Sequence, residues 1–77
     1  MPKLPVITSR ELIAALKRLG FEKYHQSGSH AQFKHSDGRR VTVPIHSGKD
    51  IKRKTLKSII ADMGLSVDEF IVLLKKK

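Results

Sequence analysis

The chain has 77 residues and no cysteine, so we expect one domain over residues 1–77 that neither disulfides nor a thiolate zinc site can stabilise. Its formal net charge is +9 and its pI is near 10.3, which indicates a polyanionic partner, most commonly nucleic acid. No apolar run approaches the length needed to span a bilayer, and the first residues lack a secretory signal, so we expect a cytoplasmic protein with no membrane partner.

The first predicted element is a helix. Thr8 and Glu11 have the spacing of a capping box, in which a hydroxyl and a carboxylate satisfy each other's backbone N–H groups. Gly20 is suited to ending the helix in a left-handed conformation. The apolar face has helical spacing and consists of Leu12, Ile13, Leu16 and Leu19.

Three short strands are predicted next, over residues 21–26, 30–35 and 41–43. The turns between them fall at residues 27–29 and 36–38, where Gly-Ser and Asp-Gly dipeptides occur. This spacing is typical of an antiparallel meander joined by hairpins. The alternation of the first strand is imperfect, which leaves its register open.

A cation-rich loop over residues 45–54 leads into a second predicted helix, which should end near Gly64. Its apolar stripe consists of Leu56, Ile59, Ile60 and Met63. Ser66 and Glu69 repeat the capping-box spacing and predict a short last helix. The order is therefore α-β-β-β-α with an extra C-terminal helix, an α+β fold in which helices cover one face of a three-stranded antiparallel sheet.

The second predicted strand separates its side chains by face. Because residues alternate along a strand, Ala31 and Phe33 should point to the core. His30, Gln32 and Lys34 should then share the opposite, wetter face. A histidine, an amide and a cation beside a Gly-Ser turn favour contact with an anion.

Histidine chemistry suits an RNA substrate. Imidazole titrates near neutrality and can take a proton from a 2′-hydroxyl, which then attacks the adjacent phosphate without a metal. Gly28 and Ser29 would let backbone N–H groups approach that phosphate, while cations stabilise its developing charge. A metal site is disfavoured because His25, His30 and His35 match no metal-ligand spacing. On local sequence alone, the favoured interpretation of His30 is an ordinary surface residue after a turn.

The motifs together resemble the HicA toxin family. The resemblance extends over about residues 8–70 and rests on segments that keep their order and spacing: Gly28-Ser29-His30, Phe33, Val41-Thr42-Val43-Pro44, His46, Gly48-Lys49-Asp50, Thr55-Leu56, Ile59-Ile60 and Gly64-Leu65-Ser66. It implies a double-stranded-RNA-binding-domain-like fold, ribosome-independent mRNA cleavage, an essential histidine at His30, and neutralisation by a HicB antitoxin.

We therefore predict a small endoribonuclease toxin with His30 as the catalytic base or acid, no metal and no cofactor. Its RNA would be bound by Gly28, Ser29, Lys34, His46, Lys49, Lys52 and Arg53. We expect the antitoxin to cover His30. Two other functions remain open: a double-stranded-RNA-type module that binds RNA without cutting it, and a protein whose basic face docks an acidic partner. Turnover of RNA separates the enzyme from both.

Overall fold

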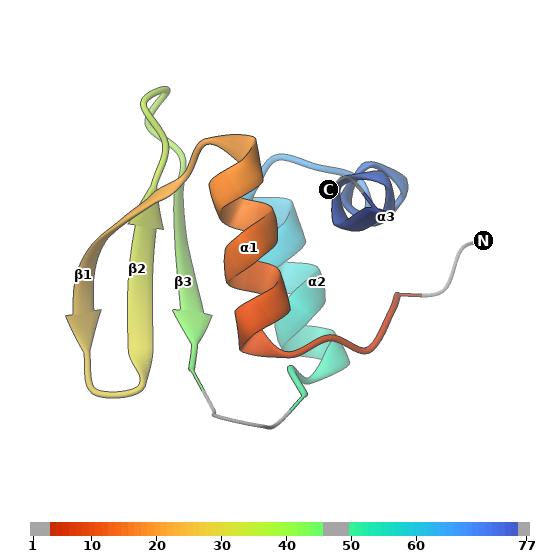
Figure 1. Cartoon of the computed structure of the whole chain (residues 1–77), viewed down its shortest axis with the longest axis horizontal. Helices are drawn as coiled ribbons and strands as arrows, with labels where there is room; N and C mark the ends of the chain where they lie inside the picture. The colour runs from red at the N-terminus through yellow and green to blue at the C-terminus, as the bar shows by residue number, and fades with distance from the viewer. Residues whose placement is uncertain (1–3, 46–49, 76–77) are drawn as a thin grey trace.

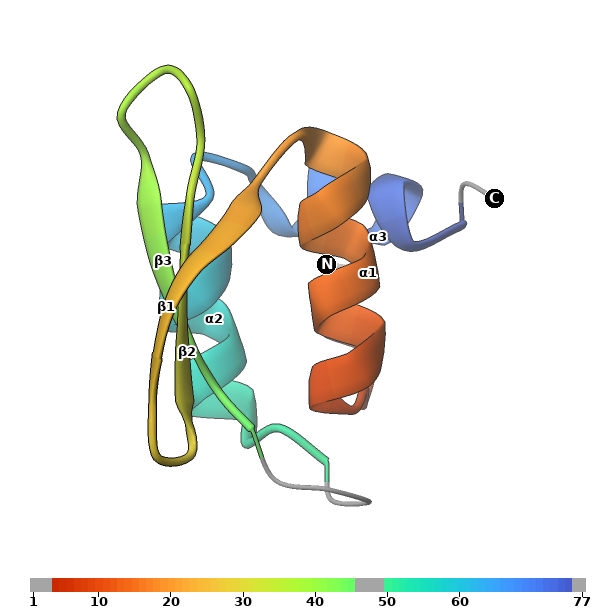
Figure 2. The same cartoon turned by 60° about the vertical axis from the view of Figure 1, so that its left-hand side comes forward.

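The computed structural model describes residues 4–45 and 50–75. In chain order the elements are α1 (Ser9–Leu19), β1 (Glu22–Ser27), β2 (His30–Lys34), β3 (Arg40–Pro44), α2 (Arg53–Asp62) and α3 (Val67–Lys75). The strands form one antiparallel sheet in the order β1-β2-β3, and the helices lie on one side of it (Figures 1 and 2). The predicted order and α+β class are confirmed, and the arrangement is consistent with a double-stranded-RNA-binding-domain-like fold.

Both predicted capping boxes are present. At the start of α1 the Glu11 backbone N–H donates to Thr8 Oγ1 at 3.3 Å, and the Thr8 N–H donates to Glu11 Oε1 at 3.1 Å. Ser66 and Glu69 make the same reciprocal pair at the start of α3. Thus local sequence fixes where these two helices begin.

The glycines that end α1 and α2 make the same left-handed cap. At Gly20 φ is 106°, and the next N–H, of Phe21, donates to Leu16 O at 2.9 Å. At Gly64 φ is 77°, and the Leu65 N–H donates to Ile60 O at 3.2 Å. This is the Schellman pattern, in which the residue after glycine contributes an apolar contact. Phe21 was predicted to begin the first strand, but it lies before β1 and is buried as that contact.

The core lies between the helices and one face of the sheet. Ala31 and Phe33 are buried as predicted, together with Val41 and Val43 of β3. The main helical contributions come from Leu12, Ala15, Leu16, Leu56, Ile59, Ile60, Met63 and Phe70. We call the uncovered side of the sheet the outer face; it carries the alternate residues of β2 and β3, namely His30, Gln32, Lys34, Arg40, Thr42 and Pro44.

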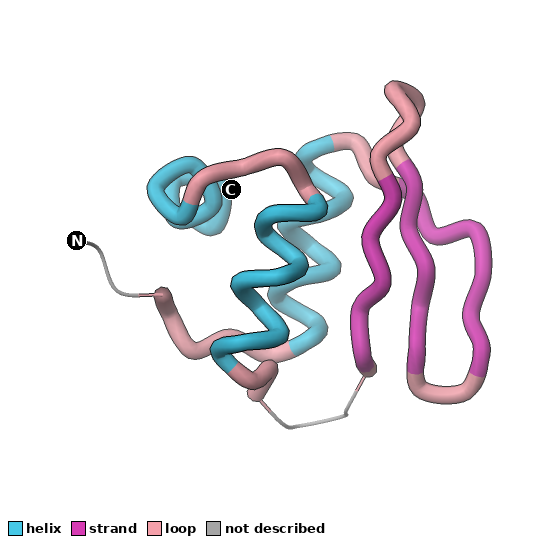
Figure 3. Tube along the Cα trace, turned by 180° about the vertical axis from the view of Figure 1, so that it is seen from behind, coloured by secondary structure: helices cyan, strands magenta, loops and turns pink. Residues whose placement is uncertain are grey.

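β1 is the edge strand farthest from the helices, as the view from behind shows (Figure 3). Every residue of β1 is exposed. Its pairing with β2 shifts between Lys23 and His25, which leaves Tyr24 as the extra residue of a β-bulge. The bulge explains the imperfect alternation, because it turns two successive residues, Tyr24 and His25, towards one face. Among the described residues no helix is long and apolar enough to cross a membrane.

Candidate active site

His30 begins the central strand, directly after the β1–β2 turn. Gly28 has a φ of 58° and Ser29 has a negative φ, the combination that a type II′ hairpin turn requires. The turn aligns His30 with Ser27 on one neighbouring strand and with Pro44 on the other. His30 is exposed, and within the described residues its ring makes no hydrogen bond. The imidazole is therefore free to contact a substrate on the outer face.

A second histidine lies diagonally across the hairpin from His30. Ser27 pairs with His30, and His25 pairs with Gln32, two residues farther along β2. Diagonal neighbours of this kind have Cα atoms about 7–8 Å apart.

Residues 4–45 and 50–75 bring together no group of three His, Cys, Asp or Glu side chains that could hold a metal ion.

The predicted RNA-binding residues fall into two groups. Gly28 and Ser29 form the turn beside His30. Lys52 and Arg53 begin α2 at the same end of the molecule, although α2 packs against the inner face of the sheet (Figure 1). His46 and Lys49 lie outside the described residues.

Lys34 shares the outer face with His30 but lies at the other end of β2. The two residues are four positions apart along the strand, which corresponds to ~13 Å. Its ammonium lies 5.2 Å from the centre of the Tyr24 ring, and the Arg40 guanidinium lies 5.9 Å from the same ring. Neither Tyr24 nor Arg40 was selected from the sequence. The broken alternation of residues 21–26 was the available signal, because a bulge often reorients a side chain.

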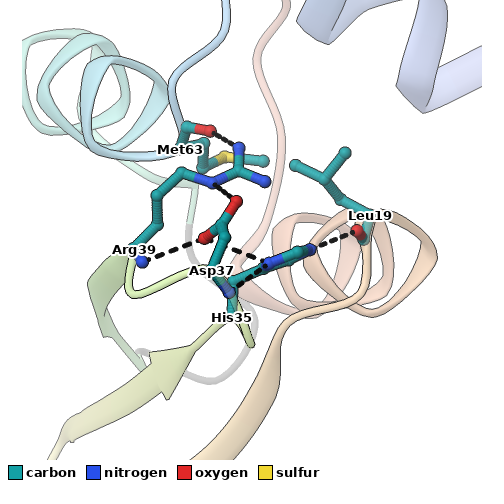
Figure 4. Close-up of polar contacts among 5 residues, drawn as sticks. All are labelled: Leu19, His35, Asp37, Arg39 and Met63. Carbon is teal, nitrogen blue, oxygen red and sulfur yellow. Dashed lines mark hydrogen bonds and ion pairs between the residues drawn. The ribbon is translucent and has the colours of Figure 1, made fainter.

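The far end of β2 holds a polar network of a different kind (Figure 4). His35 Nδ1 accepts from the Asp37 N–H at 3.1 Å, and Nε2 lies 3.2 Å from Leu19 O, the last carbonyl of α1. Both ring nitrogens therefore have a polar partner, and Nδ1 also lies 3.1 Å from Asp37 Oδ1. It also meets Phe21 edge-on, with 5.2 Å between ring centroids.

Arg39 completes this network. Its guanidinium donates to Asp37 Oδ2 at 2.8 Å and to the carbonyl of Met63, at the end of α2. Hydrogen bonds to Asp37 from the Arg39 backbone N–H, and then from its guanidinium, lower the pKa of that carboxyl below its ordinary value. The β2–β3 hairpin thus satisfies terminal carbonyls of both α1 and α2, which is a structural task.

Two surface hollows lie away from His30. One is lined by Leu19, Leu65, Glu69, Val72 and Leu73 between α1 and α3, and the other by Gly20, Glu22, Lys34, His35 and Ser36. Neither of these two hollows includes His30.

The family model described as the HicA toxin of bacterial toxin–antitoxin systems matches residues 9–65. The chain belongs to the HicA toxin family. The matched range begins with α1 and ends just after α2, so it contains the whole sheet and His30 but not α3. No curated protein matches the chain. A HicA toxin belongs to a two-component system, so membership implies an antitoxin partner.

Proposed function

We propose that this HicA toxin is an endoribonuclease that cleaves mRNA without a metal, with His30 as its catalytic base or acid. The observation that carries the proposal is the exposed imidazole of His30, which makes no hydrogen bond to another described residue and follows a Gly-Ser turn on the uncovered face of the sheet. Family membership supports the toxic role. An imidazole can act as either the base or the acid in proton transfer.

The reaction follows from the nucleophile that RNA already contains. A neutral His30 takes the proton of a 2′-hydroxyl, and the 2′-oxygen forms a bond to the adjacent phosphorus. The bond from phosphorus to the 5′-oxygen breaks, and the leaving oxygen is protonated by an imidazolium or by water. The products are a 2′,3′-cyclic phosphate and a 5′-hydroxyl.

Two features near the turn support binding of the scissile phosphate. Gly28 has no Cβ, and its surroundings are open within 4 Å, so a phosphate can approach the backbone of the turn closely. Lys52 and Arg53 supply positive charge at the same end of the molecule. Lys34 is proposed to bind RNA farther along the strand.

The direct test is cleavage of RNA by the purified chain in the presence of EDTA, with His30→Ala as the matched variant. We expect the wild type to cut, and the variant to bind RNA but not to cut. Cleavage that requires an added divalent ion would contradict the metal-free mechanism. Binding without cleavage by both proteins would instead support the RNA-binding module, and a cyclic phosphate end would identify the 2′-oxygen as nucleophile.

We also propose that a HicB-like antitoxin inhibits by covering His30 and the surrounding basic surface. The proposal rests on the exposure of His30 and on the net charge of +9, which favours an acidic partner surface. Co-purified antitoxin should abolish cleavage in proportion to complex formation. It should also protect His30 from modification by diethyl pyrocarbonate while the more buried His35 reacts slowly in both states.

A further inference from the structure

The outer face of the sheet carries a cluster of side chains that the proposed reaction at His30 does not use. Its centre is Tyr24, whose residue surface is 41% exposed although the ring is large and apolar. The Tyr24 hydroxyl donates to Gln32 Oε1 at 2.8 Å, which fixes the ring over β2. The bulge brings Tyr24 to this face, where the Lys34 ammonium and the Arg40 guanidinium lie over its ring.

The two cations of the cluster are available to a ligand. Within residues 4–45 and 50–75 neither Lys34 nor Arg40 forms an ion pair with a carboxylate. Their attraction to the ring is a cation–π contact, which is weak at an exposed site. A phosphate can therefore contact either cation without breaking a salt bridge.

We propose that the outer face binds single-stranded RNA, with a base stacked on Tyr24 and phosphates paired with Lys34 and Arg40. The proposal rests on the proposed function, because it extends the site from His30 along the same face of β2. Exposed aromatic rings beside a basic surface bind single strands in this way. The bases of a duplex are stacked on one another, so they cannot stack on Tyr24.

The geometry gives the bound strand a direction across the sheet. His30 lies at the turn end, Gln32 and Tyr24 in the middle, and Lys34 and Arg40 at the other end, paired in register. A strand held at the far end thus reaches His30 after ~13 Å, a few nucleotides away. Gln32 uses its oxygen for Tyr24, which leaves its amide nitrogen to donate to a base or phosphate.

The test measures binding of a fluorescent 2′-O-methyl single strand of mixed sequence and of the matching duplex. The methylated 2′-oxygen cannot act as nucleophile, so binding is measured whether or not the chain cleaves RNA. Tyr24→Leu removes the ring and Tyr24→Phe keeps it. Lys17→Gln, at an exposed position of α1, is the control for lost positive charge. Thermal melting of every variant reports folding.

We expect Tyr24→Leu to weaken binding of the single strand by about fivefold to a hundredfold. Tyr24→Phe and Lys17→Gln should bind the single strand with an affinity within about twofold of the wild type. Lys34→Gln and Arg40→Gln should each lower the magnitude of the slope of log K against log salt concentration by about 0.7, because each removes one phosphate contact. The duplex should bind equally to the wild type and to Tyr24→Leu.

Two results would overturn the proposal. They are single-strand binding by a folded Tyr24→Leu that equals the wild type, and a loss of duplex binding equal to the loss of single-strand binding. The proposed function has a separate test. It is contradicted if the wild type does not cleave unmodified RNA, whatever the binding of the methylated strand shows.

Discussion

The two ends of β2 carry histidines in opposite situations. His30 precedes the rest of the strand, is exposed and makes no hydrogen bond within the described residues. His35 follows the strand, has a side chain that is only 19% exposed, and has both ring nitrogens engaged. A ring bonded at both nitrogens cannot exchange protons with a substrate unless it gives up those partners. The comparison indicates that one end of the strand is free for chemistry and the other holds the fold together.

The largest expected effect is that replacing His30 changes the rate of RNA cleavage, whereas replacing His35 changes the stability of the fold. His30→Ala should lower the rate of RNA cleavage by ~10²–10⁴-fold and leave the melting temperature unchanged, because it removes only a proton-transfer group. His35→Ala should lower the free energy of unfolding by ~1–3 kcal/mol, because it leaves the Asp37 N–H and the Leu19 carbonyl without their partner. Its cleavage rate per folded molecule should match that of the wild type.

Cleavage rates at several temperatures, with melting followed by circular dichroism, check both halves of this prediction. A His30→Ala protein that melts much earlier than the wild type would show that His30 supports the fold. A fully folded His35→Ala protein that has lost cleavage would move the reaction to the other end of the strand.

The next effect comes from a pair of glycines with nearly equal backbone angles. Gly20 and Gly38 have φ of 106° and 100°, so alanine at either position costs roughly 1–2 kcal/mol of backbone strain. At Gly20 the new Cβ would also lie 3.0 Å from His35 Nε2, whereas at Gly38 it meets nothing within 4 Å. We therefore expect Gly20→Ala to destabilise the protein by about 1 kcal/mol more than Gly38→Ala, since His35 must shift from Leu19.

Urea unfolding of the two variants measures that difference directly. Equal losses of stability would mean that the contact between His35 and the end of α1 contributes little. That result would contradict the structural role given to His35. On a His35→Ala background the two glycine substitutions should destabilise the protein equally, because the imidazole that a Cβ at position 20 would meet has been removed.

The smallest effect is a pH dependence that arises at the anchored end. The pKa of Asp37 is lowered by hydrogen bonds from Arg39, so its contribution to stability is fully present above its unfolded pKa, near 3.9, and is lost as the pH falls through the lower folded value. Asp37→Asn should be less stable than the wild type at pH 6, and this gap should close below about pH 4. A gap that stays constant in melting scans between pH 6 and pH 2 would exclude the carboxylate as its cause.

Much of the fold could be predicted because its signals are local. Thr8 and Ser66 each satisfy N–H groups within their own first turn, and Gly20 supplies a backbone angle that other residues rarely adopt. The burial of Ala31 and Phe33 follows from strand alternation alone. His30 and its turn could be selected for the same reason, since Gly28, Ser29 and His30 are consecutive in the chain.

The parts that could not be predicted depend on which segments meet. Lys34 was grouped with His30 because both belong to one strand face, but the extended strand separates them by ~13 Å and pairs Lys34 with Arg40 instead. Tyr24 reaches this group only through a bulge in the pairing of β1 with β2. His35 and Asp37 have side chains suited to acid–base chemistry, but in the structure His35 contacts the Leu19 carbonyl at the end of α1. Arg39 binds Asp37 and also donates to the carbonyl at the end of α2.

By itself, the sequence determined the positions of caps, turns and buried strand residues, because those depend on interactions across a few neighbouring residues. Only the tertiary structure decided which histidine is free and which is held. That outcome depends on the carbonyls at the ends of α1 and α2, which are far from the hairpin in sequence and reach His35 and Arg39 only when the helices pack behind the sheet.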